Sequence, residues 1–152
     1  MKKLISIMST LAVLFSMIGG AFAVDDIMTP ANEYERGTKV PSYGTTWNLS
    51  KDYIGSFDFD STIYTNYNFT GKSTIKVAVS STTNNPDYYI KTFYASLYQK
   101  NRFTTKFVGK FECQRAGKTS HSFNVDSGNQ YFVELSKAAD GCWLSGTLSV
   151  YS

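Results

Sequence analysis

Apolar and polar residues alternate along most of the chain from Trp47 onward. In residues 57–69 most apolar residues stand at odd-numbered positions, and Asp, Thr and Asn occupy most of the even-numbered positions. Successive side chains of a β-strand point to opposite faces, so a period of two predicts a strand that is buried on one side. We expect this strand to break near Ser61, where the alternation is interrupted.

Similar alternation recurs along the rest of the chain, with turn residues between the repeats, in segments 75–79, 88–99, 103–113, 121–125, 131–135 and 142–150. In the third of these segments it places Phe103 and Phe107 in the core, with a bulge at Gly109. A helical period of 3.6 residues is absent from the sequence pattern. We therefore predict an all-β domain over 45–152, a single antiparallel β-sandwich of jelly-roll or immunoglobulin-like type with about seven to nine strands.

The N-terminus has the pattern of an export signal. Lys2 and Lys3 precede an apolar run over 4–18, and Ala21-Phe22-Ala23 has the small-x-small form of a cleavage site. The run is shorter than the ~20 residues that a membrane span needs, which disfavours an uncleaved anchor. We predict a signal peptide over 1–23 cleaved after Ala23, an irregular leader over 24–44, and a secreted mature protein without a transmembrane anchor.

The predicted export determines the expected oxidation state of the two cysteines. In an oxidising environment Cys113 and Cys142 are predicted to form a disulfide, and both lie on inward parities of their strands. In the chain-entropy model such a bond would stabilise the fold by roughly 3–4 kcal/mol. The alternative is a reactive thiol, which would need a base close by.

Composition narrows the function classes. The chain has 152 residues, 42% of them hydrophobic, which excludes a wholly disordered protein. A net charge of +3 is too small to indicate nucleic-acid binding. With one histidine and two cysteines, the sequence predicts neither a metal site nor a cofactor. We interpret Asp58, Asp60 and His121 as structural residues, so an enzyme is not the favoured interpretation.

Charge is unevenly distributed. Residues 61–125 hold nine basic and two acidic side chains. Within this block Lys100, Arg102, Lys106 and Lys110 share the outward parity of one predicted strand, which suggests a cationic stripe. The stripe would suit an anionic polymer or lipid headgroups, or it would keep an edge strand from pairing with another molecule.

Aromatic residues suggest a second surface. Tyr94 and Tyr98 lie opposite the core parity of their strand, and Trp143 lies opposite the core parity of the last strand. Exposed rings of this kind stack on sugar faces. The alternative is that the 24–44 leader packs over them.

The segment from Val125 to Val150 contains a Gly-x-Tyr-x-Val-like strand followed by a Gly-centred strand. This segment resembles the closing hairpin of small secreted bacterial β-sandwich modules of the pre-peptidase C-terminal type. The resemblance implies the fold class and carries no functional residue. Asp126 and Tyr131 within it also predict a corner in which the tyrosine hydroxyl caps the backbone.

Together these patterns predict an exported, non-enzymatic β-sandwich that binds an envelope or extracellular polymer, glycan or protein. Two alternatives stay open. One is a small secreted glycan-directed hydrolase whose carboxylates are assembled by the fold. The other is a secreted toxin or inhibitor.

Overall fold

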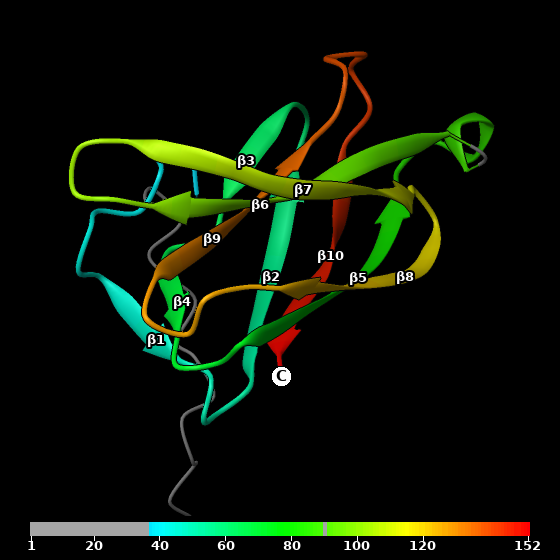
Figure 1. Ribbon diagram of the computed structural model, residues 1–152. Coiled ribbons are helices and arrows are strands. Elements are labelled where there is room, and N and C mark those ends of the chain that lie inside the picture. Colours follow the sequence, from blue (N-terminus) through cyan, green and yellow to red (C-terminus); the bar gives the residue numbers. More distant parts are fainter. Residues whose placement is uncertain (1–36, 90) are drawn as a thin grey trace, which may run out of the picture.

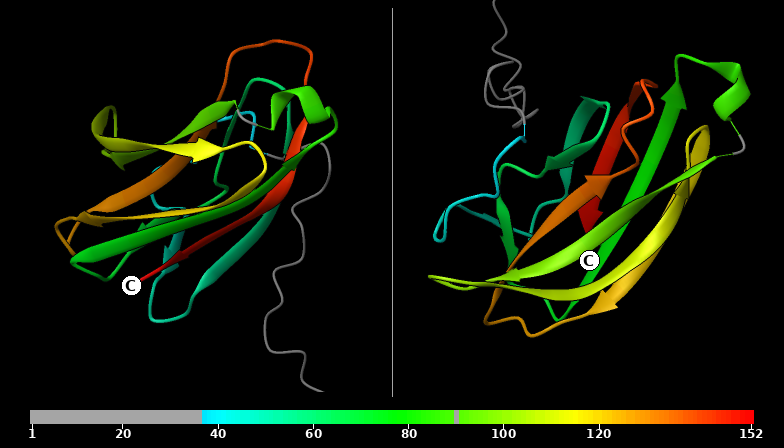
Figure 2. Two further views of the ribbon diagram at one scale, coloured as in Figure 1. Left: turned by 90° about the vertical axis from the view of Figure 1, so that its right-hand side faces the viewer. Right: turned by 90° about the horizontal axis from the view of Figure 1, so that it is seen from above.

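A computed structural model describes residues 37–89 and 91–152. The predicted signal peptide and the leader up to residue 36 lie outside the described residues. The described chain forms two facing sheets (Figures 1 and 2). The first sheet contains β1 (Thr46–Asn48), β3 (Thr62–Tyr64), β4 (Asn68–Thr70), β6 (Thr92–Lys100), β7 (Thr105–Gln114) and β9 (Gln130–Ser136). The second contains β2 (Tyr53–Phe59), β5 (Thr74–Thr83), β8 (Gly117–Asn124) and β10 (Leu144–Tyr151), and a short 3₁₀ turn η1 spans Pro86–Tyr88.

The two sheets have the strand orders β1-β4-β9-β6-β7 and β2-β10-β5-β8, and β3 pairs with the end of β9 beside β4. The β1–β4 pair is parallel and the other pairs are antiparallel. The predicted all-β class and two-layer architecture are confirmed. The described residues form ten strands rather than about seven to nine. The predicted 57–69 strand is divided among β2, β3 and β4, and the short β1 lies before it.

The core lies between the sheets and follows the predicted parity. In β5, Ile75, Val77 and Val79 are at most 2% exposed while their neighbours are half-buried. Rings from opposite sheets meet across the layer, with Phe59 against Phe93 at 6.1 Å between centroids. Burying each such side chain contributes about 1.5–3 kcal/mol, so the alternation supplies the main stabilising term.

The prediction that Phe103 and Phe107 face the core is wrong. Phe103 lies in the β6–β7 turn and is 87% exposed, and Phe107 is 51% exposed. A β-bulge explains Phe107: Gly109 pairs with Leu97 but Phe107 pairs with Tyr98, leaving Val108 as an extra residue. Because one residue is inserted, the β7 side chains that precede the bulge point to the opposite face from the one that strict alternation predicts.

The predicted tyrosine corner is confirmed. The Tyr131 hydroxyl accepts a hydrogen bond from the Asp126 backbone N–H at 3.0 Å and donates one to the Asp126 carbonyl at 3.2 Å. Tyr131 is 3% exposed, so these two bonds satisfy backbone groups at the turn between β8 and β9. They fix where β9 enters the sheet.

The predicted disulfide is not formed. Cys113 and Cys142 are both free thiols and both buried. Cys113 sits in β7, where burial raises its thiol pKa to about 12. Cys142 precedes β10 in the other sheet, and its Sγ lies 2.6 Å from the Thr83 hydroxyl. Cys113 is therefore buried within a strand of the first sheet, and Cys142 is buried in the segment that leads into β10.

Candidate functional site

The outer face of the first sheet carries five aromatic side chains. We call this set the aromatic face: Tyr64, Tyr94, Tyr98, Phe107 and Phe132. They come from β3, β9, β6 and β7, which are consecutive in the sheet. Their position follows from the register, because Tyr98 pairs with Phe132 on one side and with Phe107 on the other. The bulge that removes Phe107 from the core is what brings it onto this face.

Four of these rings form a continuous row across the strands. The centroid of Tyr64 lies 6.1 Å from that of Phe132, which lies 5.3 Å from Tyr98, with the Phe132 and Tyr98 planes 11° apart. Phe107 continues the row at 5.5 Å from Tyr98. Phe132 is 2% exposed, whereas Tyr64 and Tyr98 are half-buried. Phe132 is therefore the buried centre of a row whose other members reach solvent.

Polar groups lie in the adjacent row of the same face. Ser96 pairs with Glu134 on one side and with Lys110 on the other. Lys110 Nζ lies 4.4 Å from the centroid of the Tyr94 ring, in cation–π geometry. Glu112 pairs with Tyr94 on the same face, so the aromatic face combines apolar area with the carboxylates of Glu134 and Glu112 and the ammonium group of Lys110.

The electrostatics of the tyrosines reflect this neighbourhood. Partial burial, followed by the charge of Glu134, raises the pKa of the Tyr64 and Tyr98 hydroxyls above the usual value. Both phenols therefore stay protonated at neutral pH and offer hydrogen-bond donors beside the Glu134 acceptor. A ligand over the row would meet ring faces, hydroxyls and a carboxylate together.

The predicted site residues are only partly brought together. Tyr94, Tyr98 and Lys110 share the aromatic face, and Lys100 lies one row further along β6. The predicted cationic stripe is wrong, because the bulge at Val108 places Lys106 opposite Gln99 on the other face of the sheet.

The last two predicted site residues lie elsewhere. Arg102 sits in the β6–β7 turn. Trp143 is 48% exposed in the segment before β10, where its backbone N–H donates to Asn84 Oδ1 at 3.2 Å. It belongs to a loop at the end of the second sheet and takes no part in the aromatic face.

Sequence reasoning missed Tyr64, Phe107, Phe132 and Glu134. A signal for Phe132 was present: three consecutive apolar residues, 131–133, interrupt the alternation and indicate a strand covered on both faces. Tyr64 and Glu134 gave no such signal. Their proximity depends on the pairing of β3 with β9, which joins residues 70 positions apart.

The described part of the leader follows the edge of the first sheet. The Tyr64 backbone N–H donates to the Gly37 carbonyl at 2.6 Å, and Asn68 Nδ2 donates to the Ser42 carbonyl at 2.7 Å. Gly44 N–H donates to the side chain of Gln130 at 2.9 Å. Residues 37–44 therefore fasten onto β3, β4 and β9 through backbone and polar side-chain groups.

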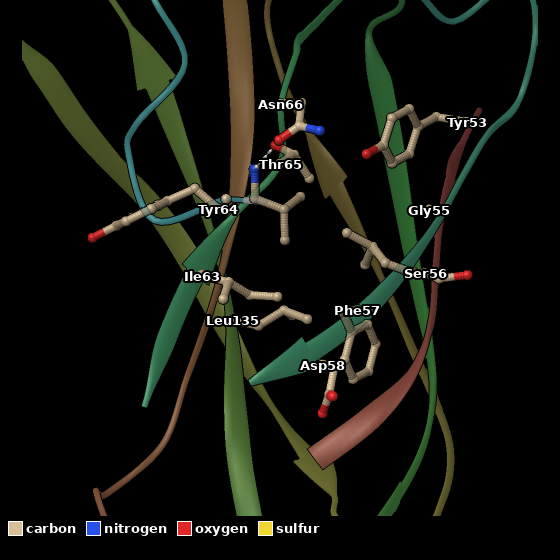
Figure 3. A pocket seen from close by; sticks show the side chains of 13 residues that line it. Tyr53, Gly55, Ser56, Phe57, Asp58, Ile63, Tyr64, Thr65, Asn66 and Leu135 are labelled. Carbon is tan, nitrogen blue, oxygen red and sulfur yellow. Dashed lines mark hydrogen bonds between the residues drawn. The ribbon is translucent and has the colours of Figure 1, made fainter. Parts of the chain in front are cut away.

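A small pocket lies between β2 and β3, with Phe57, Ile63 and Leu135 pointing into it and Tyr64 pointing away (Figure 3). Its volume is about 60 Å³, enough for water but not for a sugar ring. Among its described lining residues, Asp58 is the one carboxylate. A glycosidase requires two carboxylates flanking the bond, and this pocket does not assemble such a pair.

His121, the other candidate for chemistry, lies on β8 at the open edge between the sheets. Its ring lies 5.4 Å from Phe111 and 4.7 Å from Phe123 between centroids. These ring contacts agree with the structural interpretation. Across residues 37–89 and 91–152, no group of three or more metal-ligating side chains gathers at one place.

Comparisons with known proteins found no relative of this chain. No protein-family model, curated protein or solved structure matches the chain. The resemblance of 125–150 to pre-peptidase C-terminal modules stays a prediction. Within the described part of the chain, no helix has the length and apolar character needed to cross a membrane.

Proposed function

We propose that this protein is an exported, non-enzymatic β-sandwich that binds an extracellular or envelope polysaccharide on the aromatic face. The observation that carries the proposal is the row from Tyr64 through Tyr98 to Phe107, which crosses four neighbouring strands on a solvent-facing sheet. The export-type N-terminal pattern supports the compartment.

Sugar chemistry fits this surface. One side of a pyranose ring presents C–H groups with slight positive charge, which favour the negative face of an aromatic ring. The hydroxyl rim needs hydrogen-bond partners, and Glu134 and the two phenols lie within or beside the row. The rings of the row that reach solvent, Tyr64, Tyr98 and Phe107, lie on different strands, so neighbouring units of one sugar chain could contact them while the buried Phe132 packs between Tyr64 and Tyr98.

The row also runs across neighbouring strands of one sheet face. A polymer can lie along such a face, whereas a small molecule would be poorly enclosed by it. Because β6 pairs with β9 without interruption and with β7 on both sides of a single bulge, the rings are held on a rigid support, and little order has to be gained on binding.

The test is retention on a panel of insoluble polysaccharides and isolated cell walls. We expect Tyr98→Ala to weaken retention at least about tenfold, as truncation of a central aromatic contact does, and Phe107→Ala to weaken it less. The matched control is Ile54→Ala, which removes an apolar side chain that is 60% exposed on the other sheet. Retention should change little with salt, because the contacts are mainly uncharged.

Two results would count against the proposal. One is an absence of retention on every polysaccharide and wall preparation by a folded protein. The other is equal retention of the Tyr98→Ala and Ile54→Ala variants. Thermal melts of each variant show that a loss of binding does not come from unfolding.

A further inference from the structure

The turn between β6 and β7 projects from one end of the molecule (yellow-green in Figures 1 and 2). Its own polar groups hold it: Asn101 N–H donates to the Thr104 carbonyl at 2.9 Å, and Gln99 Nε2 donates to Asn101 Oδ1 at 3.1 Å. The turn therefore does not depend on an apolar contact for its shape.

Phe103 sits at this turn with 87% of its surface exposed, the highest value among the exposed large hydrophobic residues described. Its ring contact is with the neighbouring Arg102, whose guanidinium carbon lies 5.4 Å from the ring centroid. A phenylalanine ring left in water gains little from folding, so the Phe103 ring is free to be buried against a partner.

Basic residues surround Phe103. Lys100 and Arg102 line a shallow groove with Phe103 and with Tyr43, a residue of the leader that is 52% exposed. Lys106 lies just beyond, in a neighbouring groove that also contains Asp126. The sequence from residue 88 to residue 111 contains no Asp or Glu. The hairpin tip therefore presents an aromatic ring within a strongly positive surface.

We propose that this hairpin tip is a membrane-docking site, in which Phe103 enters the interfacial layer of an anionic lipid bilayer. Tyr43 would lie at the headgroup level, as amphipathic rings do. Lys100, Arg102 and Lys106 would face the negatively charged headgroups. A soluble polyanion would use the same cations but leave the ring of Phe103 in water, so the combination favours a bilayer.

This inference does not depend on the polysaccharide proposal. Phe103 lies outside the aromatic face, and the two surfaces are tested with different variants. Each basic residue near an anionic surface contributes about a fivefold change in partitioning. Transfer of the Phe103 ring out of water adds at least about tenfold.

The experiment is co-sedimentation with large vesicles of equal parts phosphatidylglycerol and phosphatidylcholine, compared with vesicles of phosphatidylcholine alone. Phe103→Ala and Lys106→Gln are tested against matched controls on the second sheet, Ile54→Ala and Lys118→Gln. All variants carry the same residues 1–36, so any contribution of this segment to vesicle binding is the same in each.

A local probe identifies which part of the protein enters the bilayer. Phe103→Trp is made in a Trp143→Phe background, because Trp143 is itself half exposed. The spectrum of the Trp143→Phe protein, which keeps Trp47, is subtracted to obtain the emission of position 103. We expect its emission to shift to the blue on anionic vesicles and to be quenched by lipids with brominated acyl chains. We also expect about tenfold weaker partitioning for Phe103→Ala and about fivefold for Lys106→Gln, with the controls unchanged.

Other outcomes overturn the inference. The tip does not insert if Phe103→Ala sediments with vesicles as Ile54→Ala does. The same conclusion follows if vesicles leave the emission at position 103 unchanged. The tip binds soluble polyanions instead if it does not insert into vesicles and if Lys106→Gln, but not Phe103→Ala, weakens binding to soluble polyphosphate.

Discussion

The strongest single prediction concerns a group of three charged residues at the end of the sandwich. Arg115 is 3% exposed and its Nη1 lies 2.7 Å from Asp140 Oδ2. The Lys137 side chain is fully buried, and its Nζ lies 2.8 Å from Asp140 Oδ1. One carboxylate thus serves two buried cations that come from different parts of the chain. We predict that Asp140→Asn removes this compensation while keeping nearly the same side-chain shape.

The size of the effect follows from the burial of the cations. Removing one partner of a buried ion pair costs about 3–5 kcal/mol, because a charge is left without compensation. Asp140 is 21% exposed, and Lys137 also donates to the Ala138 carbonyl at 2.9 Å, so water and backbone relieve part of this cost. We therefore expect the free energy of unfolding to fall by about 2–3 kcal/mol, a large share of the ~5–15 kcal/mol typical of a domain.

The same contacts set a pH dependence. The hydrogen bond from Lys137, together with Arg115, holds the pKa of Asp140 well below its usual range. A carboxyl group whose folded pKa is depressed stabilises the fold above its unfolded pKa of ~3.9. That stability is lost as the pH falls toward the folded pKa. The parent should therefore lose stability between about pH 5 and pH 2, and Asp140→Asn should lose less over this range.

The assay is urea unfolding followed by fluorescence at pH 7 and at several lower pH values. Asp58→Asn, which changes an exposed carboxylate on β2, should stay within about 0.5 kcal/mol of the parent. Adding Lys137→Met to Asp140→Asn should recover part of the loss, because one unpaired cation is removed. An Asp140→Asn protein as stable as the parent at pH 7 would refute the reasoning.

Three further predictions test the fold. Tyr131→Phe removes both hydrogen bonds of the tyrosine corner and should lower the free energy of unfolding by about 1–2 kcal/mol in urea titrations, and an unchanged midpoint would contradict this role. Gly146→Ala would place a Cβ against the Ser80 carbonyl of the paired strand, so we expect loss of more than about 3 kcal/mol or failure to fold, judged by circular dichroism. Cys113 and Cys142 should both resist iodoacetamide in the native state and both react in urea without reductant, and an intact mass two units short of the dithiol would contradict free thiols.

Much of the architecture was predictable because its cause is local. Alternation at residues 75–79 predicts which face each side chain takes, whatever the partner strand is. The corner at Tyr131 was predictable for the same reason, since its two hydrogen bonds span five residues. Short-range patterns of this kind need no knowledge of pairing.

The candidate sites were less predictable because they depend on pairing between distant strands. The aromatic face exists because β3, β9, β6 and β7 are neighbours in one particular register. The predicted bulge at Gly109 is confirmed beside Val108, but parity alone did not show which side chains it would turn: the extra residue moves Phe107 outward and separates Lys106 from Lys110.

The sequence by itself determined that the chain builds two sheets with apolar inner faces, because a period of two dictates side-chain direction within each strand. The tertiary structure alone decided which outward rings form a row, which cations share Asp140, and that the cysteines stay apart. These features arise from long-range register, where one inserted residue exchanges the two faces of a strand, and that register is fixed when the sheets assemble.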